Sequence, residues 1–94
     1  MQQACAQARH FTFYLLDGFA LHGFSAAIEA LRLANDVVGR PIYGWHLVTA
    51  DGEPAISSCG TGIPAAGPLS AERTRFGRGT DTGFVVVCGG RTKP

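Results

Sequence analysis

The five-residue segment FVVVC, residues 84–88, constrains the fold of this 94-residue chain more than any other feature. It is apolar without interruption, and a glycine pair, Gly89-Gly90, follows it directly. Short apolar runs without polar alternation are typical of parallel strands that are buried on both faces. The segment HFTFYLL, residues 10–16, has the same character and stops at the turn pair Asp17-Gly18. The sequence therefore predicts a parallel sheet that needs cover above and below.

One amphipathic helix is predicted over residues 21–38. Apolar or small side chains recur there at spacings of three and four residues, and they define one face: Phe24, Ala27, Ile28, Leu31, Ala34 and Val38. Glu29, Arg32 and Asp36 lie on another side of the helix, at spacings that allow ion pairs. Gly39 is the kind of residue that ends a helix.

The remaining segments supply short strands and turns rather than a second convincing helix. In chain order, they are a disordered tail at 1–9, a strand at 43–50, a small hairpin formed by 54–58 and 61–64, and a loop at 65–83 with one helical turn near 69–73. The strand at 43–50 ends at the turn pair Asp51-Gly52.

The order strand, helix, strand, hairpin, loop, strand predicts an α/β domain with parallel pairing through a crossover helix, the beginning of a three-layer sandwich. A parallel sheet needs helices on both faces, whereas this sequence offers one. One face would then lack cover. We expect that the chain is the first part of a larger domain; the alternative is that a second copy completes it.

Charge and apolar content exclude several classes of function. Eight Lys and Arg against seven Asp and Glu give a net charge of +1, too small to attract nucleic acid or an anionic membrane. The basic residues near the C-terminus are expected to be solvated loop charges: Arg73, Arg75, Arg78, Arg91 and Lys93. No run approaches the roughly 20 apolar residues of a membrane span. The opening MQQACAQARH is polar, unlike a signal peptide.

The three cysteines, Cys5, Cys59 and Cys88, are widely spaced and contain no Cys-x-x-Cys pair, which favours a reducing cytoplasm. Cys88 ends an apolar strand and is expected to be a buried structural thiol, because no base is near it in the sequence. Cys59 has no recognisable base either. The histidines show no metal-ligand spacing: His10, His22 and His46. We predict no catalytic residue, no metal site and no cofactor.

Ligands of open α/β sheets bind beyond the carboxyl ends of the strands. Two such ends are visible, Asp17-Gly18-Phe19 and Gly89-Gly90. Backbone N–H groups of a glycine pair can hold a carboxylate or an oxyanion there. The alternative is that both ends are tight turns that need glycine for backbone conformation alone.

These segments, in their order, resemble a known family over about residues 11–90. The carriers are the strand into Asp17-Gly18-Phe19, the helix motif EALRLAN at 29–35, the Tyr43-x-Trp45 strand, Asp51-Gly52, and the strand into Gly89-Gly90. They resemble the ThiJ/PfpI, or class I glutamine-amidotransferase-like, superfamily. More narrowly, they are similar to the N-terminal sensory domain of GlxA-type AraC-family transcriptional regulators.

The resemblance implies a flavodoxin-like α/β sandwich, often dimeric, that responds to a small nitrogenous metabolite and directs a C-terminal helix-turn-helix pair on DNA. Enzymatic relatives use a cysteine on an elbow after the glycine pair, helped by an acid early in the first helix. This chain ends before the elbow, and Gly23 stands at the position of the acid. The resemblance therefore implies a non-catalytic chain that does not bind DNA alone.

Carried over by residue, Gly89 and Gly90 match the turn that lines the oxyanion pocket, and Asp17 to Phe19 match the neighbouring loop. Glu29 and Arg32 match the helix motif, where they position the helix or lie at a dimer contact. We expect residues 10–94 to be the N-terminal portion of a truncated sensing domain. Two alternatives stay open: the N-terminal fragment of a cysteine-dependent ThiJ/PfpI hydrolase or glyoxalase-like enzyme, and a self-contained dimeric interaction module.

Overall fold

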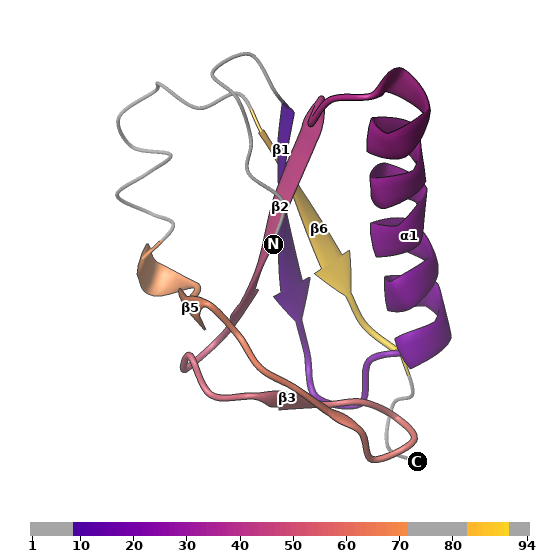
Figure 1. The fold of residues 1–94 in the computed structure, drawn as a ribbon. Helices are drawn as coiled ribbons and strands as arrows, with labels where there is room; N and C mark the ends of the chain where they lie inside the picture. Colours follow the sequence, from indigo (N-terminus) through magenta and orange to yellow (C-terminus); the bar gives the residue numbers. More distant parts are fainter. Residues whose placement is uncertain (1–8, 72–82, 91–94) are drawn as a thin grey trace.

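The structure is a computed structural model, and it describes residues 9–71 and 83–90 of the chain. A parallel sheet with a long helix on one face and a small hairpin at one end makes up the described part (Figure 1). The elements are β1 (Arg9–Leu15), α1 (Leu21–Val38), β2 (Tyr43–Thr49), β3 (Ala55–Ile56), β4 (Gly62–Ile63), β5 (Gly67–Pro68) and β6 (Phe84–Cys88).

The main sheet has the strand order β5-β2-β1-β6, and each neighbouring pair runs parallel. The aromatic strand β1 lies in the centre, where Phe11 pairs with Trp45 of β2 on one side and with Phe84 of β6 on the other. The predicted α/β class and parallel sheet are confirmed. The arrangement is that of a partial flavodoxin-like fold.

The core lies between the sheet and α1, because alternate residues of β1 point toward the helix. Phe13 and Leu15 are buried there, together with Phe19 from the turn that follows the strand. Phe24 of α1 packs edge-on against both phenyl rings, with ring centroids 5.8 Å from Phe13 and 5.6 Å from Phe19. These aromatic contacts hold the start of α1 against the carboxyl end of β1.

The other face of the sheet is unevenly covered. Thr12 and Val48 are buried, whereas Val85 and Val87 of β6 are 48% and 60% exposed. Exposed valines on a parallel strand agree with the expectation that one helix leaves part of this sheet without cover.

The helix boundaries follow from backbone hydrogen bonding. α1 covers the predicted range, and Gly39 ends it in the left-handed conformation with φ of 85°, which lets its N–H donate to the carbonyl of Asn35. Asn35 is also the one fully buried residue of the helix. Its amide donates from Nδ2 to the carbonyl of Tyr43 at 3.0 Å, and its Oδ1 accepts from the Tyr43 N–H at 2.9 Å.

Two strand assignments differ from the sequence prediction. Arg9, which we assigned to a disordered tail, begins β1 and pairs with Tyr43. Residues 67 and 68, which we assigned to a loop, form the edge strand β5 beside β2. Backbone hydrogen bonds to β2 flank β5 at its two ends: the Ala66 N–H donates to the carbonyl of Leu47, and the Leu69 N–H donates to the carbonyl of Thr49. Edge strands tolerate proline because one side of the strand needs no partner.

Some sequence predictions fall outside the described residues. They are the tail at 1–8, Cys5, residues 72–82 of the loop predicted at 65–83, and the five basic residues near the C-terminus. Of the helical turn predicted near 69–73, Ser70 and Ala71 are helical and the remainder is not described. Across 9–71 and 83–90, no helix is long and apolar enough to cross a membrane.

Candidate functional site

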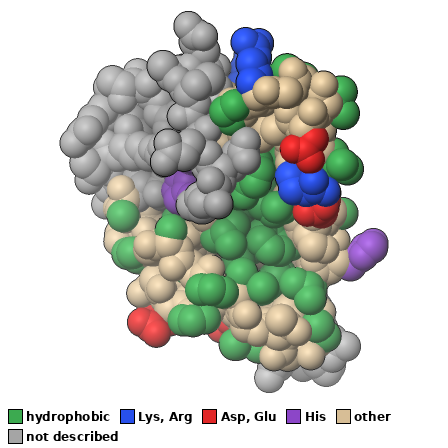
Figure 2. Space-filling view, in the orientation of Figure 1, with side chains coloured by type: hydrophobic (Ala, Val, Ile, Leu, Met, Phe, Trp, Pro, Cys, Tyr) green, Lys and Arg blue, Asp and Glu red, His purple; other side chains and the backbone are tan. Residues whose placement is uncertain are grey.

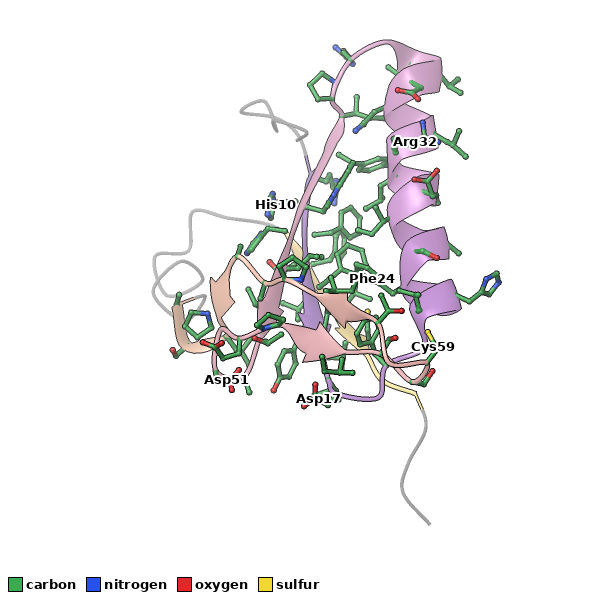
Figure 3. All side chains as sticks on the ribbon, turned by 60° about the horizontal axis from the view of Figure 1, so that its bottom comes forward. His10, Asp17, Phe24, Arg32, Asp51 and Cys59 are labelled. Atoms are coloured by element: carbon green, nitrogen blue, oxygen red, sulfur yellow. The ribbon has the colours of Figure 1, made fainter. Side chains whose placement is uncertain are left out.

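The structure brings the two predicted ligand-binding segments together at the carboxyl edge of the sheet. Phe19 and Gly90 form an isolated antiparallel bridge, and the Ala20 N–H donates to the carbonyl of Gly89 at 3.0 Å. The Leu16 N–H donates to the carbonyl of Cys88 at 3.1 Å just before the two segments meet. The five residues predicted from the sequence therefore form one cluster, which Figure 3 views from the side of this edge.

The three glycines of this cluster have different structural requirements. Gly18 has a φ of 86°, a conformation that only glycine adopts without strain. Gly90 is in close contact with the opposite segment, since a Cβ there would lie 2.4 Å from the Gly18 carbonyl oxygen. A Cβ on Gly89 would meet nothing within 4 Å. Backbone conformation accounts for Gly18 and close packing accounts for Gly90, whereas open space lies beside Gly89.

Asp17 connects this edge to the hairpin. Its Oδ1 accepts a hydrogen bond from the Ile56 N–H at 3.0 Å, and the Gly18 N–H donates to the Ile56 carbonyl at 2.7 Å. The Ser58 N–H donates to the carbonyl of Phe19 at 2.8 Å. The β3–β4 hairpin is thus tied to the same turn by three hydrogen bonds. Because the Phe19 ring is fully buried, that residue can offer a ligand only backbone atoms.

The first turn of α1 begins beside the cluster without a capping side chain. Ala20 occupies the N-cap position and makes no side-chain hydrogen bond, and the first turn contains no acidic residue. Gly23 is exposed, and a Cβ there would meet nothing within 4 Å. Position 23 therefore has room for an acidic side chain, but the residue there is glycine.

The hairpin also presents a cysteine that sequence reasoning set aside. Cys59 is exposed, with its Sγ 3.2 Å from the Ser57 hydroxyl and 3.5 Å from the Thr61 hydroxyl. Hydrogen bonds to Ser57 and then to Thr61 lower the pKa of the Cys59 thiol. The pattern Ser-x-Cys-x-Thr was the signal available in the sequence. Cys88, which we expected to be buried, is only partly buried, and that partial burial raises the pKa of its thiol.

Two cavities lie near these elements. A cavity of about 140 Å³ lies at the ends of β1 and β2, and its lining includes three acidic residues, Asp17, Asp51 and Glu53, beside uncharged ones. An apolar groove of about 410 Å³ runs between α1 and β2, visible as the central hydrophobic area of Figure 2. Phe24, Trp45 and Leu47 line this groove, together with the segment 64–66. Neither cavity was predicted from the sequence.

Glu29 and Arg32 lie away from the carboxyl edge, on the outer flank of α1. Arg32 forms ion pairs with Glu29 at 2.6 Å and with Asp36 at 2.7 Å, and all three residues belong to α1. The hydrogen bond from Arg32 lowers the pKa of Glu29. This row of acidic, basic and acidic side chains points to solvent and contributes nothing to the ligand-binding cluster.

Two of the three histidines meet across the sheet, which their sequence positions do not indicate. The imidazole rings of His10 and His46 lie on neighbouring strands with centroids 4.7 Å apart, and His10 Nε2 faces His46 Nδ1 within hydrogen-bond distance. In the described part of the chain, no group of three or more His, Cys, Asp or Glu is placed to hold a metal ion.

Comparisons with known proteins point to transcriptional regulators. The sequence matches no protein-family model. It is 39% identical over 79 residues to the HTH-type transcriptional regulator GbdR of Pseudomonas aeruginosa, a match that covers 83% of this chain. It is 40% identical over 62 residues to the HTH-type transcriptional regulator CdhR of the same species, over 66% of this chain.

The fold has a counterpart among solved structures. The crystal structure of an AraC family transcriptional regulator from Pseudomonas putida aligns with a TM-score of 0.73 at 24% sequence identity. The alignment covers 92% of this chain and 43% of that chain. The present chain spans 19% of the length of GbdR and 18% of that of CdhR. The relatives of this chain are thus transcriptional regulators with a helix-turn-helix, and the chain corresponds to a minor part of each.

Proposed function

We propose that this chain is the first part of a small-molecule-sensing domain of an AraC-family transcriptional regulator, and that it is not catalytic. The observation that carries the proposal is the 39% identity to a helix-turn-helix regulator over 83% of the chain. The likeness of fold to an AraC family regulator supports it. In this proposal the domain is of the ThiJ/PfpI, GlxA-type class and cytoplasmic, and DNA binding belongs to another part of the parent protein.

The proposed ligand site is the cluster of Asp17, Gly18, Phe19, Gly89 and Gly90. Open space beside Gly89 admits a small ligand, and the Asp17 carboxylate lies in the wall of the adjoining acidic cavity. A carboxylate at one end of the site suits a cationic amine, which agrees with a nitrogenous metabolite. The backbone at Gly89 suits a carboxylate or another oxyanion on the same ligand.

The enzyme alternative is not favoured, because the curated relatives are regulators. The residues near the cluster support the same view. Burial raises the pKa of Cys88, which keeps its thiol protonated and poorly nucleophilic at neutral pH. Gly23 leaves the position of the acid without a side chain.

The experiment is a binding screen with the 94-residue chain. Thermal-shift and calorimetric titrations with a panel of amino acids, amines and amides should identify at least one compound that raises Tm in a concentration-dependent way. Gly89→Val should abolish that shift by filling the open space. Gly67→Val is the matched control, since a Cβ at that glycine also meets nothing within 4 Å and the residue lies on β5.

Two results would contradict the proposal. One is that no compound of the panel raises the Tm of the unmodified chain. The other is that Gly89→Val binds a compound as tightly as the unmodified chain does. A separate gel-shift titration with duplex DNA tests the DNA-binding expectation, and the chain alone should leave the duplex unshifted at physiological salt.

A further inference from the structure

The imidazole rings of His10 and His46, here called the histidine pair, form a contact between β1 and β2 that the proposed function does not use. In the register of these strands, His10 lies opposite Gly44, and His46 lies opposite Thr12. The two histidines are therefore diagonal neighbours, and the lack of a side chain at Gly44 leaves room for the rings to meet. Both residues are half-buried, and their ring centroids lie 4.7 Å apart.

The geometry of the contact limits the protonation states that the two rings can take together. His10 Nε2 faces His46 Nδ1 within hydrogen-bond distance. A neutral imidazole has one N–H donor and one acceptor nitrogen, whereas an imidazolium carries a donor on both nitrogens. One of the two facing nitrogens must accept, so at least one ring is neutral while the contact lasts. Two imidazolium rings would set N–H against N–H and positive charge against positive charge.

In the described part of the chain, few charges lie where they could offset that repulsion. Side chains alternate between the faces of a strand, which puts the histidine pair on the face opposite α1, where Figure 3 shows His10. The same alternation places Tyr14 on this face, and the four strands of the main sheet contain no acidic residue. On the α1 face, the Arg9 guanidinium lies over an aromatic ring. Glu29 borders the apolar groove there, and its carboxylate is paired with Arg32.

We propose that the histidine pair is a pH-sensitive contact, closed near neutral pH and opened when both rings are protonated. Histidine is the side chain whose charge ordinarily changes between pH 5 and 8. The unfolded chain can accept a proton on each ring, whereas the closed pair accepts at most one. The unfolded state thus binds more protons on acidification, so the free energy of unfolding falls as the pH falls. Opening should loosen the amino-terminal half of β1 against β2, where the pair lies.

Urea unfolding of the 94-residue chain at pH 7.5 and pH 5.0, followed by circular dichroism, tests the proposal. Between these pH values, the unfolding equilibrium constant should rise about tenfold more in the unmodified chain than in His10→Gln, which corresponds to one proton withheld from an ordinary histidine. Glutamine keeps hydrogen-bonding groups and cannot take the charge. Carboxylates that titrate near pH 4 are common to both chains, so their effect cancels in the comparison.

His22→Gln is the matched control, because His22 is exposed in the first turn of α1 and does not belong to the pair. It should keep the pH dependence of the unmodified chain. Equal pH dependence of the unmodified chain and His10→Gln, or loss of the dependence in His22→Gln, would overturn the proposal.

A spectroscopic readout keeps the proposal testable if His10→Gln fails to fold. Trp45 is the single tryptophan of the chain and precedes His46 on β2. Its emission maximum should shift in step with protonation of the second ring, which imidazole NMR signals follow, while circular dichroism shows that α1 is intact. His46→Gln should abolish the shift, and His22→Gln should retain it. Protonation of both rings with no change in the Trp45 emission maximum would contradict the proposal.

Discussion

The side-chain amide of Asn35 pairs with the backbone of Tyr43 on both its donor and its acceptor side. The carbonyl of Asn35 also accepts hydrogen bonds from the N–H groups of Gly39 and Arg40. One residue therefore closes the end of α1 and fixes the start of β2 against it. Asparagine is a poor helix former, so its presence in the EALRLAN motif is explained by this tertiary contact.

Replacing Asn35 should destabilise the chain without disturbing the carboxyl edge. Asn35→Ala removes both side-chain hydrogen bonds and leaves the Tyr43 N–H and carbonyl without them, which we expect to cost about 2 kcal/mol of unfolding free energy. Urea denaturation followed by circular dichroism measures the loss. Asp36→Asn, at the adjacent exposed position, serves as the control; it removes only the exposed ion pair with Arg32 and should change the unfolding free energy by less than about 0.5 kcal/mol. Equal midpoints for Asn35→Ala and the unmodified chain would contradict the assigned role.

Alanine at the two glycines after β6 should have very different effects on the unfolding free energy. Gly90→Ala forces a Cβ to within 2.4 Å of the Gly18 carbonyl oxygen, so the two segments must separate, at a cost of about 3 kcal/mol. Gly89→Ala meets no atom within 4 Å and should change the unfolding free energy by less than about 0.5 kcal/mol. Thermal unfolding of the pair gives the comparison. A tolerated Gly90→Ala would mean that the Phe19–Gly90 bridge is not maintained in solution.

Gly23 should be replaceable with a gain in stability. The residue lies inside α1, and a Cβ there has open space around it. Alanine removes the entropy cost of glycine in a helix, worth about 0.5–1 kcal/mol. We therefore expect Gly23→Ala to raise Tm by about 4 °C. A lowered Tm would indicate that this position needs glycine for a reason other than helix geometry.

Cys59 should be the more reactive of the two described cysteines. Hydrogen bonds from Ser57 and Thr61 lower its pKa, so more thiolate is present near neutral pH, whereas burial raises the pKa of Cys88 and keeps it as a thiol. In a Cys5→Ser background, iodoacetamide at pH 7.5 should alkylate Cys59 first, as peptide mass spectrometry can follow. The rate should fall with decreasing pH as the thiolate is protonated.

The hydroxyl groups provide the control for this reactivity. Ser57→Ala removes the largest cause of the lowered pKa and should slow alkylation of Cys59 at pH 7.5. Ser58→Ala, the adjacent exposed serine, should leave the rate unchanged. Faster labelling of Cys88 than of Cys59 would show that the hairpin does not hold the thiol as described.

Periodicity and turn residues were sufficient to predict most of the fold. The bounds of α1 and β6 agree with the prediction, because continuous apolar spacing and terminal glycines mark both segments. The strand β5 was missed, since Gly67-Pro68 has the composition of a turn and becomes a strand only through pairing with β2. Local sequence carries no information on such a partner.

The ligand-binding cluster was predicted as a group of residues, and its ligand role stays a prediction. What the sequence did not indicate is that Asp17 holds the hairpin, because its bond to Ile56 joins positions 39 residues apart. The lowered pKa of Cys59 was missed for a related reason. It depends on hydroxyl orientations within a tight turn rather than on a neighbouring base.

The central position of β1 has a consequence for how the protein is made. Phe11 pairs on one side with a residue of β6, Phe84, which lies far along the chain. At synthesis rates of about 5–20 residues per second, about 4–15 s separate the two residues on the ribosome. During that interval one edge of an aromatic strand has no partner, and unpaired edges promote aggregation. The strand at the centre of the described sheet is thus the one that waits longest for a partner in the nascent chain.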